Sequence, residues 1–166
     1  MVTVRRLSLA SIAGLCACVA GGALDEGPPP DLDENEFRCA AEPVLLARCA
    51  FFACHGSNRR PLRIFAPDKL RTGVSAADRA SPLTPEEREV NYDMARGFAR
   101  TAPDGVPLLD KPLDVEAGGR YHGGKDLYGG ADVFETTADP GYALLEGWVR
   151  GEKAADDCLP TGAVGP

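Results

Sequence analysis

The sequence is poor in histidine, tryptophan and methionine, and it has no excess of basic residues. Its 166 residues include two histidines, one tryptophan and two methionines. Lysines and arginines number 18 against 25 aspartates and glutamates, which gives a formal net charge of −7 at pH 7. Nucleic-acid phosphates would repel a chain of this charge, so we exclude nucleic acid as a partner. Because histidine is so scarce, each one is informative where it stands beside another reactive side chain.

Patterns that mark several common classes of enzyme are also missing. We find no internal repeat, no phosphate-binding glycine loop, and no Ser-His-Asp or paired-carboxylate arrangement that stands out. The glycine-rich stretch GGRYHGG at 118–124 does not fit a dinucleotide fingerprint, which needs a strand before it and a helix after it. Beyond residue 18, no segment is apolar enough to cross a membrane.

Residues 1–18 have the features of an export signal. Arg5 and Arg6 supply a positive start, and an apolar run too short to span a bilayer follows. The run ends in LCAC at 15–18, which resembles a bacterial lipobox and implies that Cys18 becomes lipid-modified and forms the new N-terminus. An ordinary secretory signal is the alternative, and both interpretations export the protein.

Residues 19–36 are rich in glycine, proline and acidic residues and poor in anything that packs, which predicts an extended tether. Removal of the signal leaves 16 basic and 25 acidic residues, a net charge of −9 that permits partners with basic docking faces. We expect a soluble domain held by an N-terminal lipid anchor in the bacterial cell envelope, facing the periplasm or the outer membrane.

The cysteines need an explanation, because free thiols rarely persist in an exported protein. Of six cysteines, Cys16 leaves with the signal and Cys18 is acylated, which leaves Cys39, Cys49, Cys54 and Cys158. If Cys49 and Cys54 work together, a Cys39–Cys158 bridge would close a loop of about 120 residues and add roughly 4 kcal/mol in the chain-entropy model. The alternative is a Cys49–Cys54 bridge beside an ordinary Cys39–Cys158 bridge.

The first of three expected helices covers about 35–49. Its apolar residues fall on one face at helical spacing. Pro43 either kinks this helix or sits in the first turn of a shorter one that starts near Glu42.

Two further helices are expected at about 85–99 and 140–150. Thr84 and Glu87 form a capping box at the start of one, and Gly151 stops the other. The sequence therefore predicts a mainly α fold, a small domain over 37–158 with three or more helices and long Gly/Pro-rich loops, followed by a disordered tail at 159–166.

The connections between these helices are long. PLRIF at 61–65 is expected to be a short extended piece, and residues 101–138 contain no periodic run of helix length. Such a connection is uncommon in a compact domain without a reason, and a bulky cofactor that fills the core would be one.

The stretch CAFFACHG at 49–56 contains the elements of covalent haem attachment. Two thiols must reach the two vinyl groups of the ring, and a histidine beside the second thiol binds the iron from one face. The usual spacing places two residues between the cysteines. Here four residues separate Cys49 from Cys54, and His55 follows at once.

The segment EPVLLARCAFFACHGSNRRPLRIF resembles the opening of cytochrome c domains in bacterial envelope lipoproteins and planctomycete-type cytochrome c proteins. PLLDKPL at 107–113, GGRYHGG and DPGYALLEGWVRG resemble the closing part of such domains. The resemblance covers about residues 37–151. It implies a cytochrome c-like fold with one covalent haem c on Cys49 and Cys54, although the widened cysteine gap departs from the standard motif.

His122 and Met94 are the two candidates for the second axial ligand of the iron. Glycines flank His122, which lets the backbone approach a flat ring, and the resemblance also places a histidine there. Met94 lies on the apolar stripe of its helix, where methionine is more often core filler. With His55 and His122 both bound, the iron has no open site, so we expect an electron carrier with a redox partner protein in the envelope and no enzyme activity.

Other residues near the motif have two interpretations each. One of Arg59, Arg60 and Arg63 would pair with a haem propionate, or all three are solvated surface charge. The aromatic residues Phe51, Phe52 and Phe65 cover the ring edge or pack the core. Trp148 is expected to pack the last helix on the first.

Three other classes of function remain open. Cys49, Cys54, His55 and His122 have the composition of a tetrahedral zinc site. A cofactor-free, disulfide-stapled lipoprotein that serves as a binding or structural module is the second. An enzyme with an open haem, such as a peroxidase, is the third, and the second histidine weighs against it.

Overall fold

The computed structural model describes residues 28–101, 105–123 and 132–153. Over these ranges the protein is mainly helical, as the sequence predicts, and no β-strand forms. In the same ranges no helix has the length and apolar character needed to cross a bilayer. The expected signal at 1–18, most of the expected tether, Cys158 and the expected tail at 159–166 lie outside the described residues. The elements in chain order are α1 (Glu34–Glu36), η1 (Phe37–Ala41), α2 (Glu42–Val44), η2 (Leu45–Cys49), α3 (Ala76–Ala80), α4 (Pro85–Phe98), α5 (Pro107–Asp110), η3 (Val115–Ala117) and α6 (Pro140–Val149).

The first helix is continuous from Glu34 to Cys49 and alternates between α and π turns. In its last turn, η2, the N–H of Ala50 donates to the carbonyl of Leu45 at 3.0 Å, a bond that spans five residues. The sequence left open a kink at Pro43 or a new start near it. The structure instead has an unbroken helix whose turn type changes around that proline.

Helices α4 and α6 begin where the capping residues predict. Thr84 accepts a hydrogen bond from the N–H of Glu87, and the Glu87 carboxylate accepts one from the N–H of Thr84, so the capping box is complete. Asp139 caps α6 through the N–H of Gly141 at 2.7 Å. Gly151 follows the end of α6 with a φ of 74°, which glycine adopts without strain.

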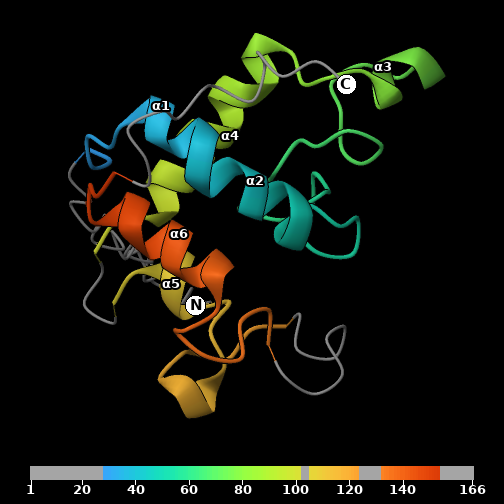
Figure 1. Cartoon of the computed structure of the whole chain (residues 1–166). Coiled ribbons are helices and arrows are strands. Elements are labelled where there is room, and N and C mark those ends of the chain that lie inside the picture. Colours follow the sequence, from blue (N-terminus) through green and yellow to red (C-terminus); the bar gives the residue numbers. More distant parts are fainter. Residues whose placement is uncertain (1–27, 102–104, 124–131, 154–166) are drawn as a thin grey trace, which may run out of the picture.

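Helices α4 and α6 lie beside the first helix (Figure 1), and an aromatic cluster of Phe37, Tyr92 and Trp148 joins the three. The Trp148 ring lies 4.9 Å from the Phe37 ring between centroids, and its indole N–H donates to the carbonyl of Asp33 at 3.0 Å. Tyr92 of α4 packs 5.6 Å from Phe37, and its hydroxyl donates to the carbonyl of Leu32. The prediction that Trp148 packs the last helix on the first is confirmed. Buried aromatic rings of this size dominate the energetics of a small core.

An isolated β-bridge between Leu113 and Phe134 joins the chain just after α5 to the chain just before α6. The N–H of Asp114 donates to the carbonyl of Phe134, and the N–H of Phe134 donates to the carbonyl of Pro112, each at 2.9 Å. The expected extended piece at 61–65 forms no strand, but its backbone is bound at Phe65 by the side chain of Asn91. These contacts position the two loops that carry the histidines.

Arg71 organises the long stretch between the first helix and α4. Its guanidinium donates to both carboxylate oxygens of the buried Glu87, with the shortest distance at 2.8 Å. It also donates to carbonyl oxygens of the surrounding loop, those of Asp78, Arg79, Ser81 and Pro82. One buried ion pair therefore ties down a stretch whose regular structure is limited to the short helix α3.

Candidate functional site

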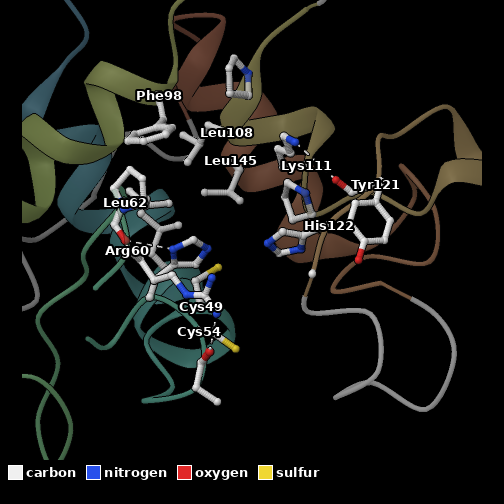
Figure 2. A pocket seen from close by; sticks show the side chains of 17 residues that line it. Cys49, Cys54, Arg60, Leu62, Phe98, Leu108, Lys111, Tyr121, His122 and Leu145 are labelled. Carbon is white, nitrogen blue, oxygen red and sulfur yellow. Dashed lines mark hydrogen bonds between the residues drawn. The ribbon is translucent and has the colours of Figure 1, made fainter. Parts of the chain in front are cut away.

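A cavity of about 320 Å³ lies between the end of the first helix, the loop that follows it, α5 and the segment at 121–123. Figure 2 shows its apolar wall and the sulfur and nitrogen atoms at its edge. The volume lies in the range of small-molecule sites. Cys49, Cys54, His55 and His122 all line this cavity. The apolar wall consists of Leu45, Leu62, Phe98, Leu108, Pro112 and Leu145.

Cys49 and Cys54 are free thiols at one side of the cavity. Cys49 ends η2 and is buried, and burial raises the pKa of its thiol to about 12. Cys54 lies in the following loop and is half-buried. The structure thus has no Cys49–Cys54 bridge, which was one of the pairings that the sequence allowed. Cys39 is disulfide-bonded, and its expected partner Cys158 lies outside the described residues.

The loop that carries the two cysteines is a compact turn. The N–H of Cys54 donates to the carbonyl of Phe51 at 2.8 Å, and the N–H of His55 donates to the carbonyl of Cys49 at 3.0 Å. At Gly56 an added Cβ would lie 2.2 Å from the carbonyl oxygen of Ala50. Only glycine therefore fits after His55, and the four residues between the cysteines fold back over the helix end.

His55 is held by a backbone carbonyl. Its Nδ1 lies 3.0 Å from the carbonyl oxygen of Leu62, a contact drawn as a dashed line in Figure 2. A carbonyl can only accept, so Nδ1 carries the hydrogen and Nε2 keeps its lone pair in the neutral ring. Burial lowers the pKa of His55, and the nearby His122 and Arg60 act in the same direction, against the Leu62 carbonyl. The neutral ring is the form that binds a metal.

His122 reaches the same cavity from the opposite wall (Figure 2). Its Nδ1 lies 2.9 Å from a carboxylate oxygen of the buried Asp132. Ionised carboxylate accepts and does not donate, so here too Nε2 is left with its lone pair. A ring nitrogen bound to an oxygen acceptor is the arrangement that orients histidine ligands of metals in proteins.

The two imidazole rings are matched in orientation and spacing. Their planes differ by 11°, and their centroids are 5.9 Å apart. An imidazole nitrogen lies about 2 Å from a bound transition metal and about 1 Å from its own ring centre, so two rings on opposite sides of one ion have centres about 6 Å apart. The observed spacing fits one six-coordinate iron between His55 and His122, with two thiols beside it.

Other predicted site residues divide into those at the cavity and those away from it. Of the three arginines after the motif, Arg60 lines the cavity, whereas Arg59 and Arg63 are not among its lining residues. Met94 packs against the hydrophobic core and does not line the cavity, so its position favours His122 as the second ligand. Phe52 is 83% exposed, so it neither packs the core nor covers the cavity.

The tetrahedral alternative needs several ligating side chains around one ion. Among residues 28–101, 105–123 and 132–153, no group of three or more His, Cys, Asp or Glu side chains is placed to hold one metal ion. This part of the chain includes Cys49, Cys54, His55 and His122.

Two contributors to the site have no signal in the sequence, and a third, Lys111, lies in the PLLDKPL stretch without a role assigned to it there. Leu62 acts through its backbone carbonyl, which any residue possesses. Asp132 is separated from His122 by ten positions with no motif between them. Lys111 lines the cavity from the end of α5, and its ammonium donates to the carbonyl of Tyr121 at 3.4 Å. Leu62 and Lys111 line the cavity, and Asp132 contacts it through His122, which only the folded backbone shows.

Comparison of the chain with protein-family models, with curated proteins and with solved structures finds no match. The function is therefore argued from the site itself.

Proposed function

We propose that this chain is a mono-haem c-type cytochrome-like lipoprotein that carries single electrons in the bacterial cell envelope. The observation that carries the proposal is the pair of nearly parallel imidazoles, 5.9 Å apart between ring centroids, in one cavity with two free thiols. Both rings have Nδ1 engaged, so both have Nε2 available to iron.

Each residue has a defined role in this proposal. Cys49 and Cys54 would hold the haem covalently, and His55 and His122 would supply the ligands of its iron. Haem c supplies a reversible one-electron iron couple. The apolar wall excludes water from the ring, and Arg60 and Lys111 at the cavity are the basic groups available to its propionates. With two protein ligands there is no open coordination position, so electron transfer is favoured over catalysis.

The test is the spectrum of the mature protein, produced in a bacterial envelope with haem-maturation machinery. We expect sharp reduced bands that survive acid–acetone extraction, and a mass equal to polypeptide, lipid on Cys18 and one haem. A colourless protein with one equivalent of zinc would support the Cys2His2 alternative. A colourless, metal-free protein would support the cofactor-free lipoprotein.

Replacement of His122 tests the second ligand. We expect His122→Ala to convert the low-spin spectrum to a high-spin one while the covalent haem stays attached, because one axial bond is lost. Met94→Leu is the matched control, since Met94 packs in the core, and its low-spin spectrum should be unchanged. A low-spin spectrum that persists in His122→Ala and is lost in Met94→Leu would reverse the assignment.

A further inference from the structure

The two histidines of the site are held by groups of different charge. His55 donates to the neutral carbonyl of Leu62 at 3.0 Å, whereas His122 pairs with the carboxylate of Asp132 at 2.9 Å. The Asp132 side chain is only 2% exposed. A charge in such a place is weakly screened by water, so it acts strongly on its neighbours.

The position of Asp132 is fixed by the backbone around it. The same carboxylate oxygen that meets His122 accepts the N–H of Val133 at 2.8 Å. The N–H of Asp132 donates to the buried carboxylate of Asp114 at 3.2 Å. Asp114 in turn belongs to the bridge with Phe134, so the carboxylate is built into the fold that shapes this wall.

We propose that Asp132 is a positioning residue that acts through His122 to lower the reduction potential of the bound iron, an inference that rests on the function proposed above. The carboxylate draws the Nδ1 proton of His122 toward itself and thereby makes Nε2 a stronger donor. Oxidised iron carries one more positive charge than reduced iron, so the nearby anion stabilises the oxidised form more. One electron passes to an acceptor protein of the envelope, and the proton stays between Nδ1 and the carboxylate.

The decisive measurement is potentiometric titration of the haem-loaded Asp132→Asn variant. Asparagine keeps an oxygen acceptor for Nδ1–H but removes the charge, so we expect a low-spin spectrum with a higher midpoint potential. Asp110→Asn is the charge control, because Asp110 of α5 pairs with Arg120 and not with a histidine. Its potential should move much less. An unchanged potential in Asp132→Asn, or an equal rise in both variants, would overturn the proposal.

A second measurement needs no substitution near the iron. Because the chain has two histidines, ¹⁵N-histidine labelling of the reduced wild-type protein gives two ring N–H signals. We expect the His122 signal to lie further downfield than that of His55, because its proton is shared with a carboxylate. Two signals with the same shift would refute the inference while leaving the haem proposal intact. A wild-type protein without haem would instead refute both.

Discussion

At the scale of single residues, the glycine after His55 fixes the shape of the loop that carries Cys49 and Cys54. The backbone of Ala50 and Phe51 approaches Gly56 so closely that a Cβ there would meet a carbonyl oxygen at 2.2 Å and two carbonyl carbons at 2.9 and 3.0 Å. All three atoms belong to the main chain, so no side-chain rotation can relieve the contact. Any other residue must displace the helix end that carries Cys49.

Substitution of Gly56 with alanine should therefore be costly. We expect Gly56→Ala to lower the free energy of unfolding by about 1–3 kcal/mol, the usual cost of overpacking, and to reduce the fraction of protein that incorporates haem. Urea unfolding and the haem-to-protein ratio provide the two measurements.

Gly97 gives a matched control for that experiment. It lies near the end of α4, and an added Cβ there would meet nothing within 4 Å. Gly97→Ala should stabilise the helix by up to about 1 kcal/mol, because alanine loses less backbone freedom on folding. If both variants changed the free energy of unfolding alike, the close packing at Gly56 would not be the cause.

The sequence predicted residues whose side chains carry distinctive chemistry and could not predict the groups that orient them. Cys49, Cys54, His55 and His122 were singled out by residue type and scarcity, and the fold gathers them in one cavity. The carbonyl of Leu62 has no signature, since every residue has one. Aspartate is common in this chain, so nothing marked Asp132 until the chain had folded.

At the scale of elements, the start of α4 carries the main buried ion pair with Arg71. Burial alone would raise the pKa of Glu87, but the Arg71 guanidinium and the N–H groups of Thr72 and Thr84 outweigh it and lower the pKa to about 2. The carboxylate is therefore stabilised in the folded state relative to its usual pKa of 4.5. This contribution is fully present above pH 4.5 and is lost as the pH falls toward 2.

Glu87→Gln should expose that pH dependence. We expect the variant to be less stable than the wild type by about 3 kcal/mol at pH 7, as for other broken buried pairs. The difference should shrink as the pH falls through the window between the two pKa values. Denaturant unfolding at a series of pH values measures it. A difference that is constant with pH would mean that the Glu87 charge does not contribute.

Glu42 offers a control, because its pKa is shifted in the opposite direction from that of Glu87. It is buried, and burial raises the pKa of its carboxyl above the usual value, against the attraction of Arg88 and the hydrogen bond from Asn91. A raised pKa favours the protonated form, so its contribution is lost as the pH rises through the folded-state value. Relative to wild type, Glu42→Gln should therefore gain stability with rising pH, whereas Glu87→Gln should lose it.

Helices whose first residues are marked by a nearby capping residue could be predicted from the sequence. Segments whose conformation depends on contacts with residues far away in the sequence could not. Helices α4 and α6 begin at the residues that cap them, because Thr84 and Asp139 bond to backbone only a few positions away. The π turns of the first helix have no sequence rule of this kind. The segment at 61–65 was expected to be a short extended piece, and its backbone is bound at Phe65 by Asn91 of α4, a partner 26 positions distant.

At the scale of the whole molecule, charge is unevenly distributed. Residues 43–67 include no aspartate or glutamate and have four arginines, Arg48, Arg59, Arg60 and Arg63. This segment thus carries +4, and the rest of the chain carries −11 of the net −7. The segment contains the loop that carries Cys49 and Cys54, with its exposed Phe51 and Phe52. The net charge favours a basic partner, whereas the local charge at the site favours an acidic one.

Small redox reagents distinguish these two expectations for the haem-loaded protein. We expect oxidation of the reduced protein by ferricyanide, an anion, to slow several-fold as ionic strength rises from about 0.01 M to about 0.15 M, because screening weakens local attraction. A cationic cobalt(III) tris(phenanthroline) complex should show the weaker dependence. Stopped-flow kinetics gives both slopes.

Arg59→Gln supplies the variant for this test, because Arg59 is exposed and does not line the cavity. It should flatten the ferricyanide slope while leaving the spectrum unchanged. If the ferricyanide rate instead rose with ionic strength, the net charge of the chain would govern the encounter.

The aromatic cluster also determines how the domain bears mechanical load. Tyr92 and Trp148 donate hydrogen bonds to the backbone carbonyls of Leu32 and Asp33, just before the first helix begins. Tension applied from the N-terminal side therefore reaches α4 and α6 before it reaches η2. Force applied at that end would strain the contacts of Tyr92 and Trp148 first and leave the distance between His55 and His122 undisturbed.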